Sequence, residues 1–169
     1  MMDLPKRKHI RLKDYDYSQN NIYFVTVCTH NRAELFGEIV GATLRGRPNA
    51  PDKMIEKWVL LLEKKYSNLQ VAKYVVMPDH IHLLVSLYSD ESGDHTGSPL
   101  PEIICWFKTM TTNDYIRNVK AGKFDPFNKH VWQRGYYEHI IRCDQDYEEA
   151  RQYIDENPLK YTLKKTNSL

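Results

Sequence analysis

Three stretches of the chain show the spacing of apolar and β-branched residues that is typical of β-strands. They are residues 21–29 (NIYFVTVCT), 71–77 (VAKYVVM) and 80–87 (HIHLLVSL). Only Pro78 and Asp79 separate the last two, so these strands are predicted to form an antiparallel hairpin. A fourth strand is predicted in the second half of residues 131–142 (VWQRGYYEHIIR).

Apolar residues recur at helical spacing in three further stretches, which predicts amphipathic helices. They are residues 53–66, 101–118 and 145–157. The apolar stripe of the last one consists of Tyr147, Ala150 and Ile154. Asp144 or Asp146 can cap its first turn. Pro158 is predicted to end this helix, because the residue before a proline is pushed out of the α region.

The predicted order of elements is β-α-β-β-α-β-α, which is the ferredoxin-like order with one helix added at the end. The fold class is therefore α+β, with a four-stranded antiparallel sheet, two helices on one face and an extra C-terminal helix. A length of 169 residues suits a single domain over residues 1–169. Residues 1–20 are predicted to form a basic arm, and residues 41–53 and 89–100 are predicted to form loops.

Composition adds little to this picture, since 41% hydrophobic and 27% charged residues are ordinary for a globular protein. The net charge of +2 is too small to indicate nucleic-acid binding without further evidence. Its distribution is uneven, because basic residues gather near the N-terminus as Lys6, Arg7, Lys8, Arg11 and Lys13. Such a basic end is usually solvated and less often binds phosphates.

The spacing of the cysteines and the hydropathy of the chain indicate the cellular compartment of the protein. Cys28, Cys105 and Cys143 are odd in number and far apart in the sequence. This pattern argues against a disulfide framework or a zinc knuckle and suits a reducing compartment. No apolar stretch approaches the roughly 20 residues of a membrane span, and the N-terminus lacks the apolar run of a signal peptide. A cytoplasmic protein without membrane association is therefore expected.

The candidate chemistry lies on the strand predicted over residues 80–87. Alternate side chains of a strand point to opposite faces, so its apolar residues share one face, whereas His80 and His82 share the other, open face. The apolar residues are Ile81, Leu83, Val85 and Leu87. Two imidazoles on one strand face can converge on one metal ion. Two polar residues on a solvated face have the same spacing, so the spacing alone leaves both interpretations open.

The last predicted helix offers a second candidate group. Tyr153 and Asn157 are one turn apart, so a hydroxyl nucleophile and a carbonyl-oxygen ligand share one flank of the helix. If this helix packs near the histidine face, it completes a site there. The alternative is structural, with Tyr153 as a packing residue and Asn157 as the C-terminal cap of the helix.

Three motifs, in their order and spacing, resemble those of the REP-associated tyrosine transposases. They are MPDHIHLL at residues 77–84, WQRGYYEHIIR at residues 132–142 and YIDENP at residues 153–158. The stretch RLKDYDYSQNNIYFVTVCT at residues 11–29 is similar to the opening of the same family, so the resemblance covers nearly the whole chain. These proteins are relatives of the insertion-sequence transposases that use a single tyrosine and a His-hydrophobe-His pair.

The resemblance implies a mechanism as well as a fold. It implies that His80 and His82 bind a divalent metal, Mg²⁺ or Mn²⁺, with Asn157 as a third ligand. It makes Tyr153 the nucleophile that cleaves and rejoins single-stranded DNA near a hairpin, through a 5′-phosphotyrosine intermediate. Insertion-sequence relatives work as dimers, so a homodimer is one expected assembly, although REP-associated members need not form one.

The resemblance also indicates which residues contact DNA. Arg7, Arg11 and Lys13 of the N-terminal arm are expected to contact DNA phosphates, or bases near the hairpin. Trp132, Gln133 and Arg134 begin the second motif, where they either stack on and clamp a single strand of DNA or anchor the start of a β-strand.

Other tyrosines and other functions are alternatives to this assignment. Tyr147 and Tyr161 rank below Tyr153 as nucleophiles, because Tyr147 is central in the apolar stripe and Tyr161 lies beyond the predicted helix end. His139 is expected to be structural or to support the site from outside it. An RRM-like module that binds single-stranded nucleic acid shares the fold, but no RNP1-like run is present. A metal-dependent hydrolase that uses water would not need Tyr153.

Overall fold

The computed structural model describes residues 21–37, 39–40, 43–44, 50–88 and 100–166. For residues 39–40, 43–44 and 164–166 it describes the backbone alone. Arg7, Arg11 and Lys13 of the predicted arm therefore lie outside the described residues, as do most positions of the two predicted loops.

The observed elements follow the predicted order. The strands are β1 (Asn21–Cys28), β4 (Leu69–Met77), β5 (His80–Leu87) and β6 (Tyr137–Ile141), and the helices are α1 (Pro51–Lys65), α2 (Leu100–Lys120) and α3 (Asp144–Thr166). A 3-10 turn, η1 (His30–Arg32), follows β1. Two short strands, β2 (Ile39–Val40) and β3 (Thr43–Leu44), then pair with each other. The loop prediction for residues 41–53 is therefore wrong at β3, where β-favouring residues on both strands support a short ladder.

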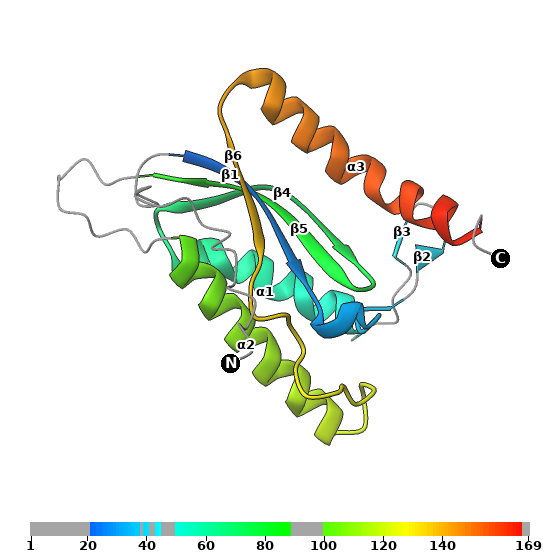
Figure 1. Cartoon of the computed structure of the whole chain (residues 1–169). Helices are drawn as coiled ribbons and strands as arrows, with labels where there is room; N and C mark the ends of the chain where they lie inside the picture. The colour runs from blue at the N-terminus through cyan, green and yellow to red at the C-terminus, as the bar shows by residue number, and fades with distance from the viewer. Residues whose placement is uncertain (1–20, 38, 41–42, 45–49, 89–99, 167–169) are drawn as a thin grey trace, which may run out of the picture.

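The strands of the main sheet lie in the order β4-β5-β1-β6. Every neighbouring pair is antiparallel, which is the ferredoxin-like arrangement. Figure 1 shows α1 and α2 on one face of this sheet, while α3 crosses the opposite face. The predicted fold is confirmed.

The hydrophobic core lies between the sheet and the pair α1–α2. In β1 every second residue is buried, as expected for a strand with one face on the core. In β5 every residue is buried, because side chains on both of its faces are covered. His80 and His82 are 5% and 4% exposed, so the expectation of an open histidine face is wrong. The sequence cannot show how closely α3 approaches this strand.

The observed end of α3 corrects the predicted helix boundary. The helix continues through Pro158 to Thr166. A proline inside a helix removes one backbone hydrogen bond and costs about 3 kcal/mol. Contacts of the following turn offset this cost, because the Tyr161 hydroxyl donates to Glu34 Oε1 at 2.7 Å and Thr162 Oγ1 donates to the Pro158 carbonyl at 3.0 Å. The rule that a helix ends before a proline fails here, because the stabilising contacts come from residues that follow Pro158 in the sequence.

The start of α1 also differs from the prediction of residue 53. The helix begins at Pro51, since a proline at the first helical position already has a suitable φ and needs no backbone donor.

None of the helices in the described part of the chain is both long and apolar enough to cross a membrane.

Candidate active site

A cavity of about 1100 Å³ lies between α3 and the sheet face that it crosses. β1 contributes Phe24 and Thr26, β5 contributes both histidines, and β6 contributes Tyr137 and His139. The residues that α3 contributes are Asp146, Ala150, Tyr153, Asn157, Lys160 and Tyr161. Arg32 of η1 also lines the cavity. The predicted histidines, tyrosine and asparagine therefore share one site.

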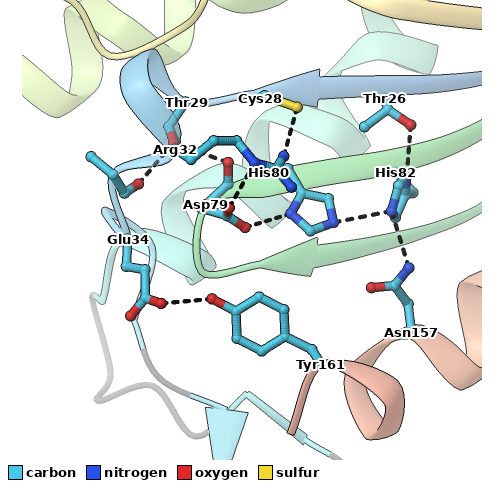
Figure 2. Close-up of polar contacts among 11 residues, drawn as sticks. Thr26, Cys28, Thr29, Arg32, Glu34, Asp79, His80, His82, Asn157 and Tyr161 are labelled. Carbon is cyan, nitrogen blue, oxygen red and sulfur yellow. Dashed lines mark hydrogen bonds and ion pairs between the residues drawn. The ribbon is translucent and has the colours of Figure 1, made fainter. Parts of the chain in front are cut away.

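The two imidazoles face each other inside this cavity (Figure 2). Nε2 of His80 and Nε2 of His82 are 3.1 Å apart. Nδ1 of His80 is 2.5 Å from Asp79 Oδ1, and Nδ1 of His82 is 2.8 Å from Thr26 Oγ1. Thr26 is the direct cross-strand partner of His82 in β1. Each ring is thus held through Nδ1, which turns both Nε2 atoms toward one point.

The separation of the two Nε2 atoms suits a single cation. Two ligands at about 2.1 Å from one ion and at right angles to each other are about 3 Å apart. Burial, then the charges of His80 and Arg32, lower the pKa of His82 to about 3. His82 is therefore a neutral imidazole at ordinary pH, the form that binds metals. The residues present fit a divalent metal ion.

Asp79 supports the pair from the hairpin turn that precedes β5. Its carboxylate also pairs with Arg32 Nε at 3.0 Å, and its backbone carbonyl accepts hydrogen bonds from Thr29. Burial acts to raise the pKa of Asp79, but the His80 hydrogen bond and the charges of His80 and Arg32 outweigh it, so the pKa is lowered. The ionised carboxylate accepts a hydrogen bond from the N–H at His80 Nδ1. The lone pair of that ring is then on Nε2, where it can bind a metal ion.

α3 brings two of the predicted residues to the imidazoles. Asn157 Nδ2 is 3.2 Å from His82 Nε2, and this asparagine is 8% exposed. A half-turn of the side-chain amide exchanges its nitrogen for its oxygen, so the same position can offer a metal ligand. The alternative role of Asn157 as a helix cap is wrong, because α3 continues beyond it.

Tyr153 lies one helical turn before Asn157. Its ring stands edge-on to His82, with 5.2 Å between ring centroids, and edge-on to Phe24 at 5.7 Å. Tyr153 is nevertheless 43% exposed, so a large substrate can reach it. The structure therefore places a phenol at the mouth of the cavity and the imidazoles within it.

Among the described residues, no group of three His, Cys, Asp or Glu side chains is arranged to hold a metal ion. The side chain of α3 that lies against the imidazole pair is the amide of Asn157. His139 is not part of the pair, because its Nε2 is bound to the Asp146 carboxylate at 2.9 and 3.0 Å at the cavity edge. This agrees with its expected supporting role.

Tyr161 was predicted to lie outside the last helix, and this prediction is wrong. It belongs to α3, lines the cavity and donates to Glu34 (Figure 2). Burial, then the Glu34 hydrogen bond, raise the pKa of Tyr161. Tyr147 is not among the residues that line the cavity.

Trp132 and Arg134 differ in their surroundings. The indole of Trp132 is 6% exposed, donates to Thr111 Oγ1 at 2.9 Å and packs against Phe36 and Phe107. This ring has no free face for a base, so the anchoring role is the one that the structure supports. Arg134 is exposed and lies outside the histidine cavity.

Thr26, Arg32 and Asp79 hold or adjoin the imidazole pair, although their role was not predicted from the sequence. Thr26 and Arg32 have no local pattern that indicates their role. Asp79 has one, since a carboxylate next to a candidate ligand histidine is a common supporting arrangement in metal sites.

Two sequence relatives come from Haemophilus influenzae. One, an uncharacterised protein, is 29% identical over 164 residues, which cover 90% of this chain and 88% of the relative. The other is named as a REP-associated tyrosine transposase and is 33% identical over 94 residues, which cover 51% of this chain and 47% of the relative.

Two solved structures share the fold. A REP-associated tyrosine transposase bound to a REP hairpin has a TM-score of 0.60 at 20% identity, with 89% of this chain and 74% of that one covered. A Deinococcus radiodurans R1 protein assigned as a transposase has a TM-score of 0.51 at 15% identity, with 86% and 95% covered.

The family model described as "Transposase IS200 like" matches residues 17–157. The match includes both imidazoles, Tyr153 and Asn157, and it agrees with the resemblance inferred from the motifs. The chain belongs to the IS200-like transposase family.

Proposed function

We propose that this protein is a metal-dependent transposase or nickase that cleaves and rejoins single-stranded DNA near a hairpin through a 5′-phosphotyrosine. The observation that carries the proposal is the convergence of His80 Nε2 and His82 Nε2, 3.1 Å apart, with Tyr153 and Asn157 on the facing helix. The fold neighbour bound to a REP hairpin supports the choice of substrate.

His80, His82 and Asn157 would hold Mg²⁺ or Mn²⁺, which suit a mixed set of nitrogen and oxygen ligands without thiolate. When bound, the ion supplies charge neutralisation at the scissile phosphate. Arg32 and Lys160 line the same cavity with side chains that are 51% and 55% exposed. Each is paired with a carboxylate, Arg32 with Asp79 and Lys160 with Glu156, but both side chains remain accessible to a phosphate that enters the cavity.

The covalent step uses Tyr153. Its phenolic oxygen forms a bond to phosphorus and loses its proton, while the bond from phosphorus to the 3′ oxygen breaks and that oxygen takes up a proton. One phosphoester replaces another, so the reverse reaction can rejoin the strand without an energy source. The 43% exposure of Tyr153 gives the strand access to the nucleophile.

The test combines the protein with hairpin oligonucleotides and Mn²⁺, followed by a denaturing protein gel. Each oligonucleotide is labelled at either its 5′ or its 3′ end. A 5′-phosphotyrosine retains the DNA on the 3′ side of the cut, so only the 3′ label is expected to travel with the protein. Tyr153→Phe should abolish this adduct, because phenylalanine has no oxygen to attack phosphorus.

Tyr147→Phe is the matched control, because it removes a hydroxyl from the same helix outside the cavity. It is expected to form the adduct as the wild type does. Cleavage without an adduct, equal in wild type and Tyr153→Phe, would identify a hydrolase instead. DNA binding without cleavage of any hairpin would identify a binding module.

A further inference from the structure

A second pair of histidines, His30 and His130, lies outside the candidate active site. Both line a neighbouring groove of about 710 Å³, and neither lines the cavity that holds His80 and His82. The rings of the second pair are 5.4 Å apart between centroids, with 86° between their planes. The corresponding values for His80 and His82 are 4.6 Å and 77°.

We propose that His30 and His130 together bind a Zn²⁺ ion, at a site separate from the candidate active site. When two imidazoles bind one ion through bonds of about 2.0 Å, their ring centroids are about 5.2 Å apart at the tetrahedral angle and about 4.5 Å apart at a right angle. The 5.4 Å of the second pair is therefore close to tetrahedral geometry, which Zn²⁺ prefers. The 4.6 Å of His80 and His82 is closer to the right angle of an octahedral ion.

The ring nitrogens of the second pair are available to a ligand. Within the described part of the chain, no hydrogen bond or ion pair holds a ring nitrogen of His30 or His130, whereas Nε2 of His139 is bound to Asp146. His30 is half-buried and His130 is exposed. The His130 ring can therefore turn about its side-chain bonds until one nitrogen faces the ion.

The surroundings of the pair indicate an open site. Cys28 lines the same groove, but its thiol accepts a hydrogen bond from Arg32 Nη1 at 2.8 Å. The described residues also contain no group of three His, Cys, Asp or Glu side chains that could hold an ion. Two imidazoles then supply half of a tetrahedral set, and water supplies the rest. Such a site binds Zn²⁺ less tightly than a structural site with four protein ligands.

The backbone holds the two histidine segments together before any ion binds. The N–H of His30 donates to the Val131 carbonyl at 2.9 Å, and Thr29 forms an antiparallel bridge with Trp132. Trp132 is itself buried in the core. The ion therefore joins two segments that are already side by side, which lowers the entropy lost on binding.

Residues next to both histidines have a left-handed backbone. The φ angles are 54° at Asn31, 57° at Arg32 and 61° at Lys129. Residues other than glycine seldom adopt this conformation, and such residues are found more often at ligand sites than elsewhere. This backbone supports a binding role for the two segments.

A bound ion would connect η1 to the segment that precedes Trp132. η1 carries Arg32, which pairs with Asp79, the carboxylate that holds His80. An ion that binds only the folded chain also stabilises it in proportion to the logarithm of the ion concentration. Zn²⁺ is therefore expected to raise the melting temperature through this pair.

The test uses a parent chain with His80→Ala and His82→Ala, so that an ion at the candidate active site does not contribute. Isothermal titration calorimetry with Zn²⁺ is expected to find one ion per parent chain, and Zn²⁺ should raise its melting temperature. Adding His130→Ala should increase the Kd for Zn²⁺ by about tenfold or more, because it removes a ligand itself, and should abolish the rise. His130 is exposed, so this change should leave the fold intact, as circular dichroism checks.

The same substitution in an otherwise wild-type chain does not depend on the folding of the parent. There, His130→Ala should reduce the number of Zn²⁺ ions bound per chain from two to one.

His139→Ala in the parent is the matched control, because it removes another exposed imidazole, one that is bound to Asp146. It should keep Zn²⁺ binding. No Zn²⁺ binding by a folded parent would show that the rings only pack against each other and would overturn the proposal. Binding that survives His130→Ala, or that His139→Ala abolishes, would overturn it as well.

Nuclear magnetic resonance identifies the ligands independently. The ring ¹⁵N signals of His30 and His130, assigned with single His→Ala variants, should shift together when Zn²⁺ is added to the wild-type chain. A shift of only one of them, or of neither, would overturn the proposal. These measurements contain no DNA, so their outcome is separate from that of the tyrosine adduct.

Discussion

One hydrogen bond at each imidazole determines which nitrogen faces the cavity. Asp79 holds Nδ1 of His80, and the Thr26 hydroxyl holds Nδ1 of His82. A ring without such a partner is free to rotate or to direct its protonated nitrogen inward. Because both partners are fixed by the sheet and its hairpin, the two donor atoms are oriented before any ion binds.

Asp79→Asn is expected to raise the Kd for Mn²⁺ by about 10- to 100-fold. The substitution keeps the size of the side chain but removes the negative charge that orients the His80 ring. Isothermal titration calorimetry with Mn²⁺ measures the change, and circular dichroism checks the fold.

Asp146→Asn is the control for this measurement. Asp146 also binds a histidine, His139, but at the cavity edge and away from the pair. Its substitution should leave Mn²⁺ affinity close to that of the wild type. If the two variants bind Mn²⁺ equally well, Asp79 does not orient the site.

Among the elements, α3 is the one that completes the candidate site. It carries Tyr153, Asn157 and Tyr161 at intervals of one helical turn, so all three face the cavity. The helix is attached to β4 through the ion pair of Lys73 with Asp155 and to the segment after η1 through Tyr161 and Glu34. These ties lie on both sides of Pro158.

Pro158→Ala is expected to stabilise the protein by about 1–3 kcal/mol. Alanine restores the backbone donor inside α3 and removes the clash of the proline ring with the preceding turn. Urea unfolding at neutral pH measures the free energy of unfolding.

Pro101→Ala is the matched control, since Pro101 lies in the first turn of α2, where a proline is well tolerated. It should change stability by much less. Equal effects of the two substitutions would show that Pro158 does not interrupt α3 energetically.

In the whole molecule, the two faces of the sheet have different roles. The face toward α1 and α2 buries the hydrophobic core, and the face toward α3 carries the candidate chemistry (Figure 1). Substitutions in the cavity are therefore expected to change activity more than stability. Tyr115 belongs to the hydrophobic core. It is 1% exposed and donates to the carbonyls of Asp125 at 3.2 Å and Leu35 at 3.4 Å.

Tyr115 makes stability sensitive to alkaline pH. Burial, then the charge of Asp125, raise its pKa to about 12. A tyrosine in the unfolded chain loses its proton near pH 10, so between about pH 10 and pH 12 the unfolded state binds fewer protons than the native state. The stabilisation is complete below about pH 10 and declines above it, by at most about 1.4 kcal/mol per pH unit.

Tyr115→Phe should therefore show a shallower decline in the free energy of unfolding above about pH 10. The variant is also expected to be less stable at neutral pH by about 1 kcal/mol, because two backbone carbonyls lose their donor. Urea unfolding over this pH range compares the two proteins. Parallel declines would contradict the assignment to Tyr115.

Much of the candidate site can be predicted from local periodicity. The period of two in β5 places His80 and His82 on the face away from Ile81 and Leu83, and the helical period places Tyr153 beside Asn157. The order of elements then specifies the ferredoxin-like sheet. These features depend on residues close together in the sequence, which is why a pattern reveals them.

Other features depend on contacts between residues far apart in the sequence. The approach of α3 that buries the histidines, the Thr26 hydroxyl at His82 and the Glu34 contact of Tyr161 join separate elements. Trp132 is in the core because Thr111, Phe36 and Phe107 surround it. Pro158 stays within α3 because packing on both sides outweighs its local cost of about 3 kcal/mol. Periodicity therefore determined which residues share a face, whereas tertiary contacts, whose energies exceed local preferences, determined which faces meet.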